Sequence, residues 1–433
     1  MNHKHTGAAG RATSRSIPRH LTPLTFLVVA NAVSLTGNVI ATVAVPWLVL
    51  TTTGSAALTG LAVFAGAGAA AIGGLLAGRI VDAIGPVRTS AVADLLSGLA
   101  VAPLPILLAF DALEIWHVVL LAIAGTLADS AGSTARQSLV PAAADDCGYA
   151  RERANAMFTS AEHIGYLLGA PIGGVLIAAI GVGGAMWVTV GAFLVAAVLV
   201  GIFVRVPAPR AAVAGAPRAG LADAIRFIWA DPALRALVVF PTVATLLIGP
   251  LVPIVLPVMA REAFGDALAL GLMVASYGAG GLLGAAAFGF IGRRLRRRFI
   301  FAGVFSIWPA IYVTLATLPP LAVAIPALLS MGVLSGSLVP MMATIRQERS
   351  PAHLLAWVVG LSTASVPVVG PIAVLVVGVL LEALGVSTTL LLMTAGTAMI
   401  GIAALSSAGV RYFDAAGSAD VPAPVGTVSA ATG

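Results

Sequence analysis

The chain has 433 residues, of which 59% are hydrophobic and only 9% are charged. About a quarter of the residues of a soluble domain are charged because its surface must be hydrated, so this composition excludes a water-soluble protein and predicts one embedded in lipid. The formal net charge of +6 would suggest nucleic acid as the partner of a soluble protein, but in a membrane protein it reflects basic loops, and we expect no nucleic-acid binding.

Long apolar runs separated by polar breaks predict that the chain crosses the membrane as helices. Each crossing takes roughly 20 mainly apolar residues, whereas a membrane β-barrel needs alternating segments of about ten residues. The first twenty residues are polar and basic and contain no apolar core, which argues against a cleaved signal peptide. In chain order, the twelve expected crossings lie at residues 24–50, 57–79, 89–110, 115–138, 157–180, 183–204, 234–258, 268–292, 299–318, 321–345, 354–383 and 386–408.

The breaks between these crossings alternate between basic and non-basic. Of the 23 Lys and Arg residues, only Arg261 falls on the outer side of the twelve-helix topology. Basic residues are retained in cytoplasmic loops because moving them across the membrane is disfavoured. We therefore expect a multi-pass protein of the bacterial inner membrane with both termini in the cytoplasm.

Composition shifts along the chain predict five segments. The break after the sixth crossing is the longest; it is rich in Pro, Ala and Gly and then becomes amphipathic around Phe227 and Trp229, which predicts a linker with a surface helix. We expect a cytoplasmic tail at 1–23, an N-terminal six-helix bundle at 24–204, this linker at 205–233, a C-terminal six-helix bundle at 234–410 and a disordered tail at 411–433.

The two bundles repeat each other in sequence. Arg136-Gln137 has a counterpart in Arg346-Gln347 at an offset of 210 residues, and the glycine at the end of the second crossing has one at an offset of 211. Repeats of six helices related by a pseudo-twofold axis along the membrane normal are a known transporter architecture. The fold class that we predict is therefore an all-α polytopic membrane protein of two six-helix bundles.

The break between crossings two and three carries a motif. It resembles the loop motif of the major facilitator superfamily, with Gly78, Asp82, Gly85 and Arg88 in the matching places, while Ala83 and Pro86 stand where that motif usually has basic residues. The resemblance implies a gate at the cytoplasmic face, formed by Asp82 pairing with Arg88, Arg136 or the N-terminus of a neighbouring helix.

A second motif lies in the fifth crossing. Its glycines form a bare stripe that allows close approach to a neighbouring helix, and with their proline, displaced by one place, they resemble the motif of the exporters of this superfamily. Segments around Pro46, Asp94 and Arg136 are similar to the branch that contains Tap-type multidrug efflux pumps. The residues of the exporter-type motif are Gly165, Gly169, Pro171, Gly173 and Gly174.

Three acidic residues lie inside the predicted crossings. Charged groups in a membrane span are costly and mark functional sites by default, and carboxylates in a low-dielectric cavity can exchange protons near neutral pH. Asp129 is the deepest and is the first candidate for proton coupling, with a structural pair with Arg136 as the alternative; Asp94 and Glu162 are further candidates.

Related transporters often place an acid in the first crossing where this chain has Asn38, which binds by hydrogen bonds but carries no proton. No Lys or Arg is expected at mid-depth of the cavity, which favours neutral or cationic organic substrates. The further residues expected to line a central cavity are Ser130, Thr242, Thr245, Met331, Ser335 and Met341.

No enzyme signature is present in the sequence. A phosphate-binding Gly-rich loop with Lys is missing, which excludes an ATP-driven pump in cis, and the six His and one Cys show no metal-ligand spacing, so we expect no cofactor or metal. The leading hypothesis is a monomeric, proton-coupled antiporter that exports drugs or hydrophobic or cationic small molecules across the bilayer. The alternatives are a metabolite importer or exchanger of the same fold and a non-transporting membrane sensor or scaffold.

Overall fold

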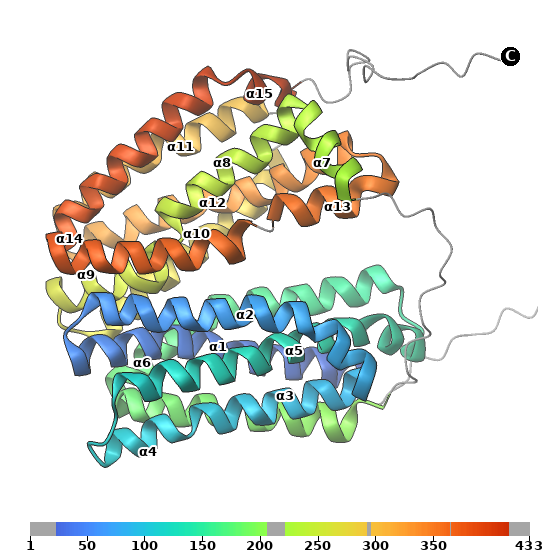
Figure 1. Ribbon diagram of the computed structural model, residues 1–433, viewed down its shortest axis with the longest axis vertical. Coiled ribbons are helices and arrows are strands. Elements are labelled where there is room, and N and C mark those ends of the chain that lie inside the picture. The colour runs from blue at the N-terminus through green and yellow to red at the C-terminus, as the bar shows by residue number, and fades with distance from the viewer. Residues whose placement is uncertain (1–22, 206–220, 292–295, 364, 415–433) are drawn as a thin grey trace, which may run out of the picture.

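The computed structural model describes residues 23–205, 221–291, 296–363 and 365–414, and these residues form helices and short connections. Most of the two expected terminal tails, and residues 206–220 of the linker expected between the bundles, lie outside the described residues. Two halves lie side by side, one coloured blue to green and the other green to red (Figure 1).

The N-terminal half comprises six α-helices and a short π-helix. They are α1 (Pro23–Thr53), α2 (Ala56–Ile84), α3 (Pro86–Val101), α4 (Pro103–Ala109), α5 (Ile115–Cys147), α6 (Arg151–Val198) and η1 (Leu199–Phe203). Helix α1 packs against α6, and α5 packs against α2 and α3.

The C-terminal half repeats this plan after the short helix α7 (Leu221–Ala230). It consists of α8 (Pro232–Ile248), η2 (Leu251–Val255), α9 (Leu256–Ala263), α10 (Ala267–Ile291), α11 (Arg297–Ala316), α12 (Leu321–Arg349), α13 (Ala352–Thr363), α14 (Ser365–Ser406), α15 (Ala408–Arg411) and η3 (Tyr412–Asp414). Here α10 packs against α12 and α11 against α14.

Ten stretches of the described chain are long and apolar enough to cross a membrane. Two of them belong to α6 and α14, where Gly181 (φ 74°) and Gly385 (φ 76°) leave the helical conformation. An unbroken helix as long as the 48 residues of α6 would measure about 72 Å, more than twice the hydrocarbon thickness of a bilayer. Each of these helices is long enough for two crossings joined at its glycine, which is compatible with the twelve crossings that the sequence predicts.

The two ends of the bundle differ in charge. The end that carries the α2–α3 and α10–α11 connections, on the right in Figure 1, holds Arg79, Arg88, Arg296 and Arg349. We call it the arginine-rich end. The opposite end, which carries the α1–α2 and α9–α10 connections, is called the arginine-poor end. Helix α7 lies at the arginine-rich end, where it packs against α8 and α13 through the buried side chains of Ala224 and Ile228.

The halves contact each other closely at the arginine-poor end. The carboxylate of Glu382 on α14 accepts hydrogen bonds from Ser55 Oγ and from the backbone N–H of Ala57 (2.8 Å), at the start of α2. At the arginine-rich end, the ion pairs found among the described residues, such as Arg349 with Asp231, do not cross between the halves. The structure is therefore closed at its arginine-poor end.

Two glycines form another close contact between the halves. A Cβ built on Gly174 of α6 would lie 2.6 Å from the Cα of Gly271 on α10, so neither backbone has room for a side chain. This close approach explains why the sequence has glycine at both positions, since any larger residue separates α6 from α10.

A valine at Gly174 is expected to open the arginine-poor end. Spin labels on Thr53 and Leu384, introduced after Cys147→Ala, should report a longer and broader distance in Gly174→Val than in the parent. The control is Gly191→Val on the same helix, because a Cβ there meets no atom within 4 Å. Equal distance distributions in Gly174→Val and the parent would show that this contact does not hold the halves together.

Candidate functional site

The N-terminal half contains a polar cavity of about 330 Å³ in the part nearer the arginine-rich end. It is bounded by α1, α5 and α6, and it brings together residues that lie up to 131 positions apart in the chain. Its lining residues are Asn31, Leu35, Asn38, Asp129, Ser133, Thr134, Arg136, Gln137 and Glu162.

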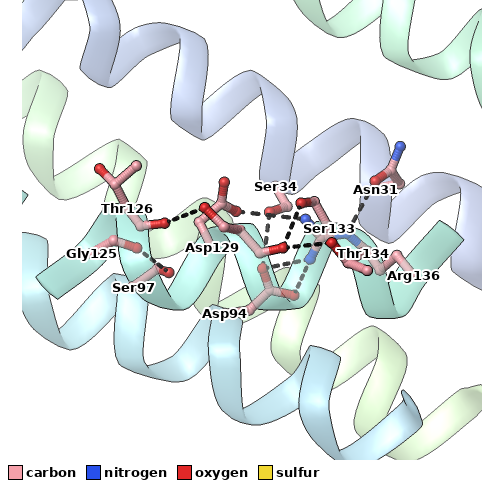
Figure 2. Close-up of polar contacts among 11 residues, drawn as sticks. Asn31, Ser34, Asp94, Ser97, Gly125, Thr126, Asp129, Ser133, Thr134 and Arg136 are labelled. Carbon is pink, nitrogen blue, oxygen red and sulfur yellow. Dashed lines mark hydrogen bonds and ion pairs between the residues drawn. The ribbon is translucent and has the colours of Figure 1, made fainter. Parts of the chain in front are cut away.

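A buried ion pair lies behind the wall of this cavity, with Arg136 as its member in the wall; Figure 2 shows its contacts. Arg136 Nη1 donates to both carboxylate oxygens of Asp94, at 2.8 and 2.9 Å, and the two side chains are 2% and 0% exposed. Ser34 Oγ also donates to Asp94 (2.9 Å), and Arg136 Nε donates to Asn31 Oδ1 (3.0 Å). Helices α1, α3 and α5 are thus tied together around one guanidinium group.

Asp129 lies on the other side of the same guanidinium. Its Oδ1 is 3.6 Å from Arg136 Nη2, beyond hydrogen-bond distance, and this buried oxygen accepts no hydrogen bond within the described part of the chain. The side chain is 21% exposed and lines the polar cavity. Asp129 is therefore the acid that water and ligands in the cavity can reach, whereas Asp94 is sealed behind Arg136.

Glu162 and Asn38 complete the cavity wall. Glu162 comes from the first crossing of α6 and places a second carboxylate in the cavity. Asn38 lies about two turns along α1 from Asn31, and no hydrogen bond of its amide is found within the described residues. The cavity therefore offers two carboxylates and a free amide to whatever occupies it.

The residues of the loop motif lie elsewhere. Asp82 and Arg88 are exposed at the arginine-rich end, on either side of Gly85 (φ 83°), and within the described residues Asp82 forms no ion pair. The expected grouping of Arg136 with this motif is not seen, because α5 continues to Cys147 and Arg136 therefore lies three turns inside the helix. Gly78 is also at this end, and a Cβ there would meet no atom within 4 Å.

The exporter-type motif divides between two partners. Gly165, Gly169 and Gly173 face α1, where an added Cβ on Gly169 would lie 2.7 Å from Val39 Cβ, while Gly174 faces Gly271 in the other half. Pro171 lies inside α6. The glycine stripe thus takes part in two close contacts, one with α1 within the N-terminal half and one with α10 of the other half.

The other expected cavity residues do not line the polar cavity. Met331 and Met341 are fully buried in the core of the C-terminal half, so their place in a central cavity stays a prediction. Ser130 packs beside Gly73 of α2 and donates to the carbonyl of Thr126 (2.8 Å). The other three donate to carbonyls of their own helix: Thr242, Thr245 and Ser335.

Sequence reasoning missed Asn31 and Ser34, although a signal was present. Together with Asn38 they occupy positions i, i+3 and i+7 of the first crossing, which is one face of a helix. Polar side chains on one face of an otherwise apolar span indicate a polar partner, and for Asn31 and Ser34 this partner is the Asp94–Arg136 pair.

The C-terminal half has the arginine but not the acids. Arg346 is 8% exposed and donates to Ser362 Oγ (2.8 Å), and it forms no ion pair with any described residue. Its counterpart Arg136 has two acidic neighbours. The membrane-embedded acid–base chemistry of the described structure is thus concentrated in the N-terminal half. Among the described residues, no group of three His, Cys, Asp or Glu side chains is placed to hold a metal ion.

Comparison with known proteins agrees with this architecture. The family model of the Major Facilitator Superfamily matches residues 27–373. The chain is 32% identical over 401 residues to the multidrug efflux pump Tap of Mycolicibacterium fortuitum, covering 91% of this chain and 98% of that protein. It is 29% identical over 411 residues to the Tap pump of Mycobacterium tuberculosis H37Rv, with coverages of 94% and 98%.

Solved structures share the fold at low sequence identity. The nucleoside transporter NupG superposes with a TM-score of 0.69 at 12% identity, covering 89% of this chain and 98% of that one. An inward-facing bacterial homologue of the lysosomal transporter Spinster also gives 0.69, at 14% identity, with coverages of 91% and 96%. The chain is a multi-pass membrane transporter, not an enzyme, and it belongs to the Major Facilitator Superfamily.

Proposed function

We propose that this protein is a proton-coupled antiporter that exports drugs or other hydrophobic or cationic small organic molecules by alternating access. The similarity to Tap pumps along nearly the whole chain supports efflux of this substrate class. The polar cavity supports proton coupling, because it exposes an acid that is held beside, but not bonded to, a buried arginine.

The position of Asp129 carries the proposal. When ionised, Asp129 is stabilised by Arg136 at 3.6 Å; when protonated, it is neutral and releases that attraction. A proton and a cationic substrate then compete for the same carboxylate, which is the requirement for exchange. Asp94, fully enclosed and bonded to Arg136 and Ser34, is better suited to anchoring the arginine than to exchanging protons. Glu162 is the second acid in the cavity and the next candidate for coupling.

We propose that the arginine-rich end faces the cytoplasm of a bacterial cell, with both termini on that side, because basic loops are retained there. The contacts between halves at the arginine-poor end then make this the inward-open state. In the outward-open state, the exposed Asp82 and Arg88 would take part in closing the cytoplasmic end, and the two halves would move as rigid bodies. A single chain contains both halves, so we propose that the monomer is the functional unit.

Two other functions are distinguishable from export. An importer or exchanger would raise the cellular content of its substrate, and a sensor or scaffold would leave it unchanged. The test is drug accumulation in a pump-deficient bacterial host, measured over a panel of cationic and neutral drugs. If the protein exports drugs, cells that express it should accumulate less of some drugs than cells with empty vector. A protonophore should raise the accumulation back to the level of the vector control. Unchanged accumulation of every drug in the panel would refute the proposal.

Loss of the Glu382 charge is expected to favour the outward-open state. A hydrogen bond to a carboxylate is roughly twice as strong as one to a neutral amide, so Glu382→Gln should weaken the contact with Ser55 and Ala57. A cysteine at Thr42, in a Cys147→Ala background, should then react several-fold faster with a membrane-impermeant thiol reagent added from outside.

The matched control is Glu114→Gln at the same end, because the contacts of Glu114 found among the described residues, with Trp116 Nε1 and the start of α5, lie within the N-terminal half. Equal reaction rates in Glu382→Gln and in the parent would argue against a latch at this position.

A further inference from the structure

A second cavity lies inside the N-terminal half, beyond the polar one. It has a volume of about 300 Å³, and every lining residue except Pro253 belongs to α1–α6. Its wall therefore comes almost entirely from one bundle, and part of the cavity is open. Drug-sized sites have volumes from about 300 Å³ upward, so this cavity is large enough to hold part of a small organic ligand.

The wall of this cavity is almost entirely apolar. Alanine, valine, leucine and proline side chains dominate it, with Phe193 at one side. Its hydroxyl groups are mostly satisfied, since Thr42 donates to the carbonyl of Val39 (2.7 Å) and Ser97 to that of Gly125 (3.1 Å). A charged group would lose its hydration here without compensation, so the occupant must be apolar.

Asn38 joins this apolar cavity to the polar one. It is the one residue that lines both, and its amide has no partner among the described residues. The apolar cavity extends along α1 toward Pro46, and the polar cavity extends in the other direction toward Asn31. The two cavities are thus arranged end to end, with an unpaired hydrogen-bonding group at their junction.

The charge of the polar cavity decides which end of a ligand it takes. Asp129 and Glu162 contribute two carboxylates, and Arg136 contributes one guanidinium whose Nη1 is already bonded to Asp94. An excess of negative charge over free positive charge favours a cationic group.

We propose that the apolar cavity is the binding site for the hydrophobic part of an amphiphilic organic cation. The cationic head of the same molecule lies in the polar cavity by Asp129 and Glu162, and Asn38 hydrogen-bonds to the linkage between them. This assignment rests on the proposed function, and it names the shape of the substrate and the single bundle that binds it. The C-terminal half then covers one side of the site with Pro253 and makes few direct contacts with the substrate.

The test uses two cations with the same head group, tetramethylammonium and 4-phenylbutyltrimethylammonium. Binding to the purified full-length protein in lipid nanodiscs is measured by calorimetry. The wild type should bind the longer cation at least about tenfold more tightly, because burial of its apolar chain favours binding.

The decisive variant is Ala122→Phe, which fills the apolar cavity from α5 opposite Gly66. It should lose most of the preference for the longer cation and keep the affinity for tetramethylammonium. Ala67→Phe fills the same space from α2 and guards against a folding defect at one position. The matched control is Ala124→Phe, two residues along α5 and exposed, which should bind like the wild type.

The outcomes separate the site from the function. If both filling variants keep the wild-type preference for the longer cation, or if the wild type has no such preference, the site assignment is wrong. Transport of the longer cation is followed separately in proteoliposomes. If the filling variants bind the longer cation with unchanged affinity and still transport it, the site assignment alone is wrong. If binding follows the predicted pattern but the wild type transports no cation, the proposed function alone is wrong.

Discussion

Asp129→Asn is expected to abolish drug accumulation driven by a pH gradient. The rate of accumulation should fall at least about 100-fold, because the substitution removes a proton-transferring group. Asparagine keeps the size and the hydrogen-bonding oxygen of the side chain but binds no proton in this pH range. The exposed acid beside Arg136 would then be permanently neutral, and proton movement could not be linked to the rocking of the halves. The measurement is concentrative uptake into everted membrane vesicles energised by respiration.

A matched control exists on the same helix. Asp146→Asn makes the same chemical change near the end of α5, where the side chain is exposed outside the cavity, and it should retain uptake. Downhill movement of drug through Asp129→Asn should persist, because the cavity and its closure are intact. Concentrative uptake by Asp129→Asn at the wild-type rate would reassign coupling to Glu162 or remove it from this cavity.

The second large effect concerns stability. Arg136→Leu leaves the carboxylate of Asp94, which is 0% exposed, without its cation, and breaking a buried pair from one side costs about 3–5 kcal/mol. The expected result is a variant that unfolds at markedly lower temperature or denaturant concentration in lipid nanodiscs, followed by tryptophan fluorescence.

The double variant Asp94→Leu with Arg136→Leu separates charge burial from packing. Because both charges are removed, no buried ion is left unpaired, and the destabilisation should be clearly less than the sum of the two single changes. Arg346→Leu is the comparison in the other half, where no ion pair is broken among the described residues, and it should cost less than Arg136→Leu. An additive double variant would contradict the account of Arg136 as the centre of a buried pair.

Much of the fold was predictable because lipid imposes a simple requirement. The spans follow from the length of the apolar runs, and the distribution of arginines predicts which loops share a side of the membrane. The predicted breaks at Gly181 and near Gly385 coincide with the two glycines where α6 and α14 turn. The helix ends were less accurate. Helix α5 continues nine residues past its predicted end at 138, since a helix does not need to stop where the hydrocarbon stops.

The site was predictable only in part. Asp129 and Arg136 are seven residues apart on one helix, so their proximity follows from helix geometry alone. The partnership of Arg136 with Asp94 depends on how α3 packs against α5, and that rotation is set by tertiary contacts. Met331 and Met341 are buried in this structure, and the polar residues of their span do not gather on one face, so its sequence does not show which face meets a cavity.

The Glu382 contact also could not be inferred from the sequence. The residue stands at the end of a predicted crossing, where acids are ordinary, and its partners Ser55 and Ala57 lie 325 or more positions earlier in the chain. Such a contact exists only in the conformation in which the arginine-poor end is closed. The sequence of either bundle alone therefore does not reveal it.

The most direct test of proton-coupled export measures protons and drug in the same vesicles. Everted vesicles that contain the wild-type protein are energised until their lumen is acidic, and a transported drug is then added while a pH-sensitive dye reports the lumen. The account predicts that the drug enters the lumen and that the lumen becomes less acidic in proportion, with neither change in Asp129→Asn vesicles. Drug entry that leaves the lumenal pH unchanged, and that proceeds equally without a pH gradient, would contradict it.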